Sequence, residues 1–372
     1  MSVEPVPNIS VIIPVYNGAA YLNSCLQAVA ASDYRCFECI VVDDGSTDAG
    51  RSIAAQFPLF VRVLHLAEGP RGPAYARNRG AEAARGAILF FLDADIMLSS
   101  RALRRVANLF QERTDVAAVF GSYDSRPAAA GVISRYRNLL HHFVHQNGNR
   151  EASTFWAGCG AIRRSVFQQI GGFDNNRFSR PSIEDIELGY RLRQSGYRIV
   201  LDKGLQGTHL KCWNLCSLIR TDISCRAIPW ARLILETKKL PNDLNLKFAQ
   251  RVSFALVALA CVFVLGSIVQ PGWLVGSAAA LVGVGIINRR LYGFFIRQGG
   301  IRFALVSFGL HIVYFLYSGL TFLSVWLKYH HRRIVGFRVC VRARSAKTAT
   351  VGIMLNNMSR ISTENQTHDH RA

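Results

Sequence analysis

The stretch AILFFLDAD, residues 87–95, decides the fold class. Its apolar part predicts a buried strand, and Asp93 and Asp95 follow that strand at once. Short apolar strands that alternate with helices are typical of an α/β domain in which helices cover a mostly parallel sheet. Further strands of this kind are expected at residues 9–14, 37–42 and 61–66, with helical patterns between them at 19–32, 47–57 and 76–86.

Acidic side chains end two of these expected strands. Asp43 and Asp44 follow one of them as directly as Asp93 and Asp95 follow the other. Ligands of such sheets bind beyond the carboxyl ends of the strands, so both pairs are candidate site residues. Carboxylates repel a diphosphate unless a cation lies between them, and this pattern therefore suits a hard divalent ion. Basic side chains that could meet a phosphate or a base lie between the two pairs, at Arg71, Arg77 and Arg79.

Two common kinds of nucleotide site lack support in the sequence. Neither a GxxxxGK[ST] loop nor a GxGxxG fingerprint follows the first expected strand. A phosphate group must therefore be bound in another way. Cys36 and Cys39 form a CxxC, but no second pair follows at the spacing of a zinc site, so we expect buried thiols in a reducing compartment.

Six segments, in their order along the chain, resemble the inverting family 2 glycosyltransferases, which have the GT-A fold. The resemblance covers about residues 8–210. It implies a Rossmann-like GT-A catalytic domain over residues 1–210 that uses a nucleotide-diphosphate-sugar donor. The segments are VIIPVYN (11–17), VVDDGSTD (41–48), GPAYARNRGAEAARG (72–86), FLDAD (91–95), WAGCGAIRRSVFQQIGGFD (156–174) and IEDIELGYRLRQSGYRI (183–199).

The resemblance implies which residues bind the donor. Asp43 or Asp44 would contact the nucleotide base. Asp93 and Asp95 match the DxD motif that holds Mg²⁺ or Mn²⁺ on the diphosphate, with Asp95 as the more direct ligand. The other residues expected on the nucleotide side are Pro14, Tyr16, Asn17, Arg77 and Asn78.

The resemblance also implies an acceptor side. Asp185 matches the general base, Glu184 is its acidic neighbour, and His209 matches a further metal or diphosphate ligand. The chemistry agrees, because transfer needs a base for the acceptor's proton and a cation for the charge that builds on the leaving diphosphate. Since Asp185 would act on the acceptor and form no bond to the sugar, inversion at the anomeric carbon follows.

Each candidate has a structural alternative. The two acidic pairs at strand ends could cap the helices that follow, and Glu184 and Asp185 could favour the positive end of their own helix. We favour the functional interpretation of the carboxylates and leave His209 open between a ligand and a hydrogen-bonded loop residue. A surface or an acceptor-groove face, rather than a metal site, is expected for the histidines of YRNLLHHFVHQ, which are His141, His142 and His145.

Charge and hydropathy divide the chain into a front and a back. The 44 basic and 24 acidic residues give a net charge of +20, and the residues after Asp243 contribute 15 basic and 2 acidic ones. Hydrophobic residues make up 50% of the chain, which excludes a disordered or low-complexity protein. The front is typical of a globular domain, and we expect no nucleic-acid partner.

The back predicts an α-helical membrane region over residues 246–330. The second of its apolar runs is short, but its Gly and Ala residues suit close packing against the first. A membrane span requires roughly 20 apolar residues. The third run is long enough, the first narrowly qualifies, and the second is short. The runs cover residues 252–269, 273–287 and 303–327.

Basic residues set the expected topology. They predict a cytosolic loop between the second and third runs. A third full span would export the tail, whereas the basic residues of the tail favour the cytosol, so the number of full spans and the side of the tail stay open. The first residues lack a basic and apolar signal pattern, so we expect the front in the cytosol, on the inner face of the plasma membrane. The loop arginines are Arg289, Arg290, Arg297 and Arg302.

Two further segments complete the predicted domains. Residues 211–245 are amphipathic, basic and aromatic, which favours helices on the membrane surface over helices packed on the catalytic domain. Residues 331–372 are basic and patternless, and we expect them to be disordered. Arg226 and Trp230 match the QxxRW motif of processive enzymes only loosely, so polymerase activity is not predicted.

The sequence therefore predicts a membrane-bound glycosyltransferase with a lipid-linked glycan acceptor, active in surface polysaccharide or glycolipid synthesis. The first alternative is a polyprenyl-phosphate glycosyltransferase, whose acceptor phosphate needs no strong base. A catalytically silent membrane scaffold is a second alternative, against which Asp44, Asp95 and Asp185 argue. A soluble-type nucleotidyltransferase is a third, disfavoured by the missing glycine-rich phosphate loop and by the apolar runs.

Overall fold

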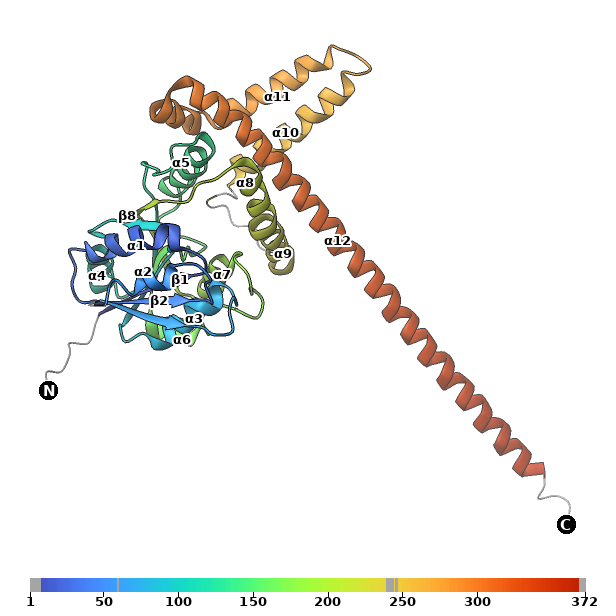
Figure 1. Cartoon of the computed structure of the whole chain (residues 1–372). Helices are drawn as coiled ribbons and strands as arrows, with labels where there is room; N and C mark the ends of the chain where they lie inside the picture. Colours follow the sequence, from blue (N-terminus) through green and yellow to red (C-terminus); the bar gives the residue numbers. More distant parts are fainter. Residues whose placement is uncertain (1–7, 59, 239–243, 245–246, 368–372) are drawn as a thin grey trace, which may run out of the picture. The chain divides into compact units, whose positions relative to one another are not determined.

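The computed structural model describes residues 8–58, 60–238, 244 and 247–367. The chain divides into two units, residues 1–321 and 322–372. The first unit contains a sheet, its covering helices and a group of C-terminal helices, and Figure 1 shows these elements in the colours of the sequence. The second unit is the continuation of the last helix.

In the described part of the chain, eight strands form one sheet in the order β3-β2-β1-β4-β7-β6-β8-β5. The pairs β1–β2, β2–β3, β1–β4 and β6–β8 are parallel. Strand β7 is antiparallel to both neighbours, and β5 is antiparallel to β8. The prediction of a mostly parallel sheet is confirmed. The strands are β1 (Ile9–Val15), β2 (Phe37–Asp43), β3 (Val61–His65), β4 (Ile88–Leu92), β5 (Ile96–Leu98), β6 (Val116–Tyr123), β7 (Cys159–Arg163) and β8 (Arg198–His209).

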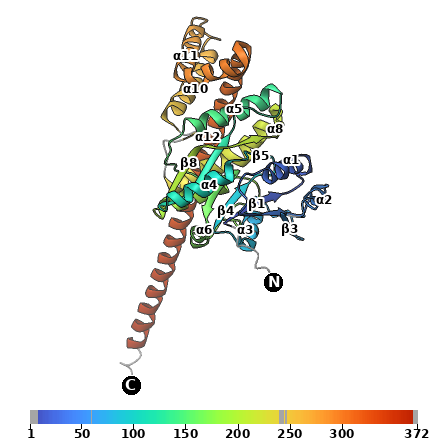
Figure 2. The same cartoon turned by 90° about the vertical axis from the view of Figure 1, so that its left-hand side faces the viewer.

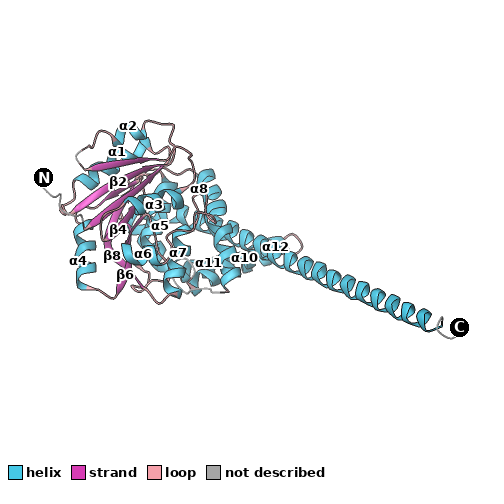
Figure 3. Cartoon of the chain, turned by 90° about the horizontal axis from the view of Figure 1, so that it is seen from below, coloured by secondary structure: helices cyan, strands magenta, loops and turns pink. Residues whose placement is uncertain are grey.

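Helices cover both faces of the sheet, as Figure 3 shows with the strands in magenta. Successive strand residues point to opposite faces, so Val11 and Ile13 join the core beneath one helix layer and Ile12 joins the other. The first layer contains α1 (Ala19–Ala30), α2 (Gly50–Ala54) and α4 (Ala102–Glu112). The second contains α3 (Pro73–Ala83), α6 (Arg164–Gln169) and α7 (Glu184–Gln194).

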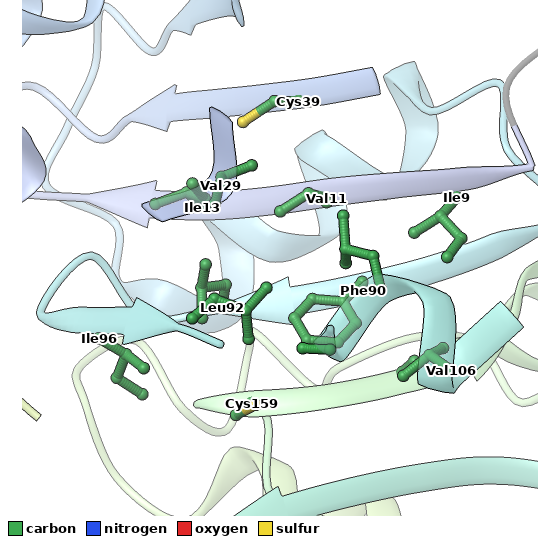
Figure 4. Close-up of a cluster of buried hydrophobic side chains, with 14 of the residues drawn as sticks. Ile9, Val11, Ile13, Val29, Cys39, Phe90, Leu92, Ile96, Val106 and Cys159 are labelled. Atoms are coloured by element: carbon green, nitrogen blue, oxygen red, sulfur yellow. The ribbon is translucent and has the colours of Figure 1, made fainter. Parts of the chain in front are cut away.

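Figure 4 shows the core beneath the first layer, where Phe90 and Leu92 of β4 lie between Val11 of β1 and Val106 of α4. Cys39 points into the same cluster and is fully buried. Burial raises the pKa of the Cys39 thiol. Cys36 is exposed, so the prediction of buried thiols holds for Cys39 and is wrong for Cys36.

Three helical segments follow β8, namely α8 (Leu215–Thr221), the π-helical η1 (Asp222–Ala227) and α9 (Ile228–Thr237). Leu233 belongs to the core of the sheet domain, and Trp230 packs against that core. Helix α9 therefore packs on this domain, whereas a location of residues 211–245 at the membrane surface was expected. For the same reason residue 210 does not end the first compact unit, which continues to Thr321.

The predicted first and second apolar runs form α10 (Phe248–Gly266) and α11 (Trp273–Ile287), which lie side by side in Figure 2. Close packing depends on glycine, because a Cβ at Gly276 would come within 2.9 Å of Phe263. At the open end of this pair, Asn288 donates hydrogen bonds to Ser253 and the carbonyl of Val284.

The last helix, α12, spans Arg289–Thr367 and is interrupted at Gly300, whose φ is 77°. Its first turns pack on α5 (Val132–Gln146) through Leu291, Phe295 and Phe303. One expectation differs from the structure here: the stretch 289–302 is helical up to Gly300 rather than a loop. The helix continues to Thr367, and the expected disorder of residues 331–372 stays a prediction.

Gly80 of α3 provides a test of the packing between α3 and the sheet. A Cβ at Gly80 would lie 2.4 Å from Cγ2 of Ile12 and 3.0 Å from Cγ2 of Val42. We expect Gly80→Ala to lower the free energy of unfolding by about 1–3 kcal/mol, because α3 must move off β1. Chemical denaturation of the full-length protein in mild detergent measures this change.

Gly131 is the matched control, because it precedes α5 in an ordinary backbone conformation and a Cβ there would meet only Ser134 at 4.0 Å. Gly131→Ala should change the free energy of unfolding by no more than about 0.5 kcal/mol. Equal effects of the two substitutions would contradict the close approach of α3 to β1.

Candidate active site

The candidate residues meet at the carboxyl end of the parallel strands. Asp93 and Asp95 follow β4, and His209 is the last residue of β8. The antiparallel pairing of β5 with β8 sets His209 opposite Ile96, and the N–H of Leu210 donates to the carbonyl of Asp95 over 2.8 Å. Sheet pairing therefore brings together residues that are more than one hundred positions apart.

Asp95 and His209 form the first part of the site. Oδ2 of Asp95 and Nε2 of His209 are 3.4 Å apart, and His209 is buried. Nδ1 of His209 donates to Oδ1 of Asn138 over 2.7 Å, so Nε2 faces the carboxylate. Burial raises the pKa of Asp95, but the hydrogen bond and charge of His209 outweigh this effect and hold it below its ordinary value.

Arg77 joins this part to the second. Its Nη2 donates to Oδ1 of Asp93 and its Nη1 to Oε1 of Glu184, each over 2.8 Å. The Arg77 side chain is only 6% exposed, and Asp93 and Glu184 raise its pKa against the effect of burial. The guanidinium is thus a fixed cation between the carboxylate after β4 and the carboxylate at the start of α7.

Asp185 lies beside Glu184 in the first turn of α7. Its Oδ2 accepts from the N–H of Ala157 over 3.1 Å, and its Oδ1 accepts from the N–H of Ile186 over 2.8 Å. Burial, with a smaller contribution from the charge of Glu184, raises the pKa of Asp185 to about 7. A carboxyl group with this pKa can take up a proton at neutral pH, as a general base must.

The two acidic residues after β2 are buried and hydrogen-bonded. Asp44 accepts from the N–H groups of Arg71 and Gly72, so it holds the loop before α3 against the end of β2. Burial raises the pKa of Asp43, but hydrogen bonds from Ser46 and His65 outweigh it and lower the pKa overall. Both residues therefore shape the loops around the end of β2.

The remaining predicted donor residues lie at the end of β1 and on α3. Tyr16 is exposed, and Pro14 is half-buried at the end of the strand. Asn17 has a φ of 51° and accepts hydrogen bonds from the N–H and hydroxyl of Thr47. The side-chain amide of Asn78 forms two hydrogen bonds with the backbone of Phe173, at the turn after α6, so its polar atoms are paired within the protein.

A divalent ion fits this site only together with other ligands. Among the residues that the structure describes, no three His, Cys, Asp or Glu side chains form a preformed metal cage. Asp95 and His209 nevertheless face each other, as two ligands of one ion would. Mg²⁺ is commonly held by one or two carboxylates plus substrate phosphates and water, so these residues suit an ion that binds with a phosphate-bearing ligand.

Three residues of the site were not identified from the sequence. Tyr123, at the end of β6, stacks on His209 with ring centroids 4.4 Å apart. Trp156 packs edge-to-face on Tyr123, and Asn138 orients His209. Trp156 is the first residue of the segment 156–174, so its position in that segment could have marked it as a site residue. Asn138 lies three residues before the histidines that drew attention instead.

A surface or an acceptor-groove face was predicted for the α5 histidines, and the surface position is wrong for His145. His145 is buried and its Nδ1 bonds the carbonyl of Gly121, while Nδ1 of His142 bonds the carbonyl of Tyr123. The His141 ring packs on Tyr123 at 4.1 Å. His141 and His145 also pack on Trp156. The His142 ring, in contrast, stacks on Phe294 of α12 with ring centroids 5.7 Å apart.

Comparison with known proteins identifies the family. The sequence model of Glycosyl transferase family 2 matches residues 10–171, and that of the N-terminal domain of galactosyltransferase matches residues 137–209. The chain is 30% identical over 208 residues to glycosyltransferase AglE of Haloferax volcanii, and the match covers 55% of this chain and 67% of AglE. The chain belongs to glycosyl transferase family 2. The prediction of a glycosyltransferase is confirmed at this level.

Other relatives match less of their own length. The chain is 36% identical over 162 residues to glycosyltransferase GlyG of Streptococcus pneumoniae serotype 4, a match that covers 43% of this chain and 53% of GlyG. A solved structure, mannosyltransferase PcManGT of Pyrobaculum calidifontis with GDP-Man and Mn²⁺, has a TM-score of 0.54 at 19% identity over 86% of this chain and 88% of that chain. This similarity confirms the predicted GT-A fold.

The Arg77 bridge makes a prediction about stability. Arg77→Gln leaves Asp93 and Glu184 without their shared cation in a largely buried place. We expect a loss of about 3–5 kcal/mol in the free energy of unfolding, because an uncompensated buried charge is costly. Adding Glu184→Gln to this variant should recover part of the loss, since one of the two unpaired charges is then removed.

Arg79→Gln is the control, because Arg79 lies on the same helix with an exposed partner, Glu82. Its effect on the free energy of unfolding should stay within about 0.5 kcal/mol. If Arg77→Gln were as harmless as Arg79→Gln, the bridge would contribute nothing to the fold of the site.

Proposed function

We propose that this protein is a membrane-attached, inverting glycosyltransferase that moves a sugar from a nucleotide-diphosphate donor to a lipid-linked glycan acceptor. The observation that carries the proposal is the Arg77 bridge. It joins Asp93, on the proposed donor side, to Glu184, and the neighbour of Glu184 is Asp185, a carboxyl group whose pKa suits a base.

On the donor side, Asp95 and His209 would hold Mg²⁺ or Mn²⁺, with Asp93 nearby on Arg77. The ion, when bound, supplies positive charge that stabilises the leaving diphosphate. Asn138 keeps the His209 ring in the orientation that this role needs. Support comes from PcManGT, whose solved structure contains GDP-Man and Mn²⁺. Asp43 and Asp44, with the exposed Tyr16 at the end of β1, are the proposed neighbours of the nucleotide base.

On the acceptor side, Asp185 would take the proton of the attacking hydroxyl. The N–H groups of Ala157 and Ile186 hold its carboxylate in place, and Glu184 keeps Arg77 beside it. Because the hydroxyl attacks the anomeric carbon from the side opposite the diphosphate, the product has the inverted configuration. Asp185 forms no bond to the sugar at any stage.

Membrane attachment is supported by the C-terminal helices. Two helices, Phe248–Gly266 and Arg289–His331, are long and apolar enough to cross a membrane. Only 17% and 28% of their most apolar windows are buried within the protein, whereas the core helix of a soluble protein would be mostly buried. Exposed apolar side chains such as Val269 and Val275 need a hydrocarbon environment.

The orientation of the protein is part of the same proposal. The arginines between Arg289 and Arg302 favour the cytosolic side of the plasma membrane for this segment. The catalytic domain, which precedes the apolar helices, would lie on that side as well. A lipid-linked acceptor suits this arrangement, because it keeps the acceptor at the surface where the enzyme is held.

The test of this function is Asp185→Asn, which keeps the size of the side chain but cannot accept a proton. Sugar transfer should fall by a factor on the order of 10²–10⁴, while donor affinity stays unchanged because Asp95, His209 and Arg77 are intact. In the unmodified enzyme, transfer should rise with pH around about 7, as Asp185 loses its proton. Transfer rate and donor binding are measured in parallel between about pH 5.5 and 8.5, a range centred on this pKa.

Near-normal transfer by Asp185→Asn would remove this residue from the mechanism and favour a phosphate acceptor, which needs no base. Loss of donor affinity in the same variant would instead assign Asp185 to the nucleotide site. A rate that does not change with pH below about 7 would contradict its role as the base.

A further inference from the structure

A second cluster of charges lies where α5, η1 and α12 meet. Oδ1 of Asp222 accepts from Arg226 and lies 3.4 Å from Nη2 of Arg137, and Oδ2 accepts from the Tyr317 hydroxyl over 2.6 Å. Asp222 and Arg137 are only 5% and 17% exposed. Burial raises the pKa of Asp222, but Arg137 and Arg226 outweigh it, so this carboxyl group stays ionised.

The charges of this cluster do not balance. Two guanidinium groups share one carboxylate, and Arg226 together with Tyr317 occupies both of its oxygens at short range. Arg137 retains a single, longer ion pair with Asp222 among the contacts of the described residues. A largely buried cation that shares its counter-ion with a second guanidinium is only partly neutralised, so there is a place for a further anion beside Arg137.

Arg137 lines a small cleft together with polar and apolar side chains. Asp222, Tyr314 and Tyr317 are among the other polar or charged residues that line it. Leu218 of α8 and Leu310 of α12 also line it, and Leu310 belongs to the helix segment that we assign to the membrane. The enclosed volume is only about 10 Å³, so a ligand that combines an anionic group with a hydrocarbon chain would lie across the mouth of the cleft rather than inside it.

The cleft is next to the candidate active site along α5. The residue after Arg137 is Asn138, which orients His209. One turn later His141 packs on Tyr123, which in turn stacks on His209. A ligand group held at Arg137 therefore lies within a few side chains of the residues that face the donor.

We propose that Arg137 binds the phosphate of the lipid-linked acceptor, with the lipid chain leaving along Leu310 toward the membrane. Arg226 neutralises Asp222 and so leaves the charge of Arg137 available. The assignment rests on the proposed function, because it names the acceptor class of that reaction. A phosphate at the same place could also come from the donor, and the experiment separates the two sources.

The experiment measures binding by the full-length protein in phosphatidylcholine nanodiscs. The probes are a polyprenyl phosphate, the matching polyprenol without phosphate, inorganic phosphate, and nucleoside diphosphates with Mn²⁺. Arg137→Gln is the main variant, and Arg137→Lys retains the charge. Arg226→Gln is a second variant, in which Asp222 would have only Arg137 as its cationic partner. Arg232→Gln on α9 is the control, because Arg232 is an exposed arginine outside the cleft.

We expect Arg137→Gln to weaken polyprenyl phosphate binding by about 10-fold or more, since it removes a charge-assisted hydrogen bond. Arg137→Lys should bind with intermediate affinity, Arg226→Gln should also bind more weakly, and Arg232→Gln should match the unmodified protein. Polyprenol and inorganic phosphate should bind weakly to all of them. Affinity for nucleoside diphosphates should not change in Arg137→Gln.

Two results would overturn the assignment. If Arg137→Gln weakens nucleoside diphosphate binding as much as polyprenyl phosphate binding, the cleft belongs to the donor. If no probe distinguishes Arg137→Gln from Arg232→Gln, the cluster only joins the helices. Binding needs no turnover, so an enzyme that binds polyprenyl phosphate but transfers no sugar would contradict the proposed function and not this site.

Discussion

The buried guanidinium of Arg77 connects the two halves of the candidate site. It contacts Asp93, which follows β4, and Glu184, which begins α7, at 2.8 Å each. Without this cation, three carboxyl groups from two parts of the chain would share a largely buried space. Their repulsion would favour protonation of all three. With Arg77 in place, each carboxyl group can have its own protonation state. The proposed chemistry needs these different protonation states.

The surroundings shift the pKa values of the two key carboxyl groups in opposite directions. His209 keeps the pKa of Asp95 low, so that this group is an anion suited to a cation. Burial and Glu184 raise the pKa of Asp185 to about 7, so that it exchanges a proton near neutral pH. Groups of one chemical type thus acquire separate functions from their environments.

Helix α5 links the site to the apolar C-terminal helices of the same unit. One of its faces carries Asn138, which orients His209, and the opposite side packs through Tyr136 and Leu139 on Phe295 of α12. The position of His209 therefore depends on a helix that also holds the first turns of α12. This arrangement explains why the first compact unit continues beyond the catalytic domain to Thr321.

Local features of this fold could be predicted from the sequence, and tertiary ones could not. The strand expected at 87–92 is β4, Ile88–Leu92, and Asp185 lies in the first turn of α7, since both depend on patterns of a few residues. The antiparallel β7 between β4 and β6 was not predicted, because strand order is set by packing across the whole sheet. The Arg77–Glu184 pair joins residues 107 positions apart, and no local pattern marks it.

The most direct test of the account is calorimetric titration of nucleoside diphosphates into the full-length protein, with Mn²⁺ or with excess EDTA. The unmodified protein and Asp185→Asn should bind with Mn²⁺ and lose most of their affinity in EDTA. Asp95→Asn should bind weakly under both conditions while still folding, because it keeps the size of the side chain. Equal binding with and without Mn²⁺, or unchanged binding by Asp95→Asn, would contradict the division of the site into a metal-dependent donor half and a base half.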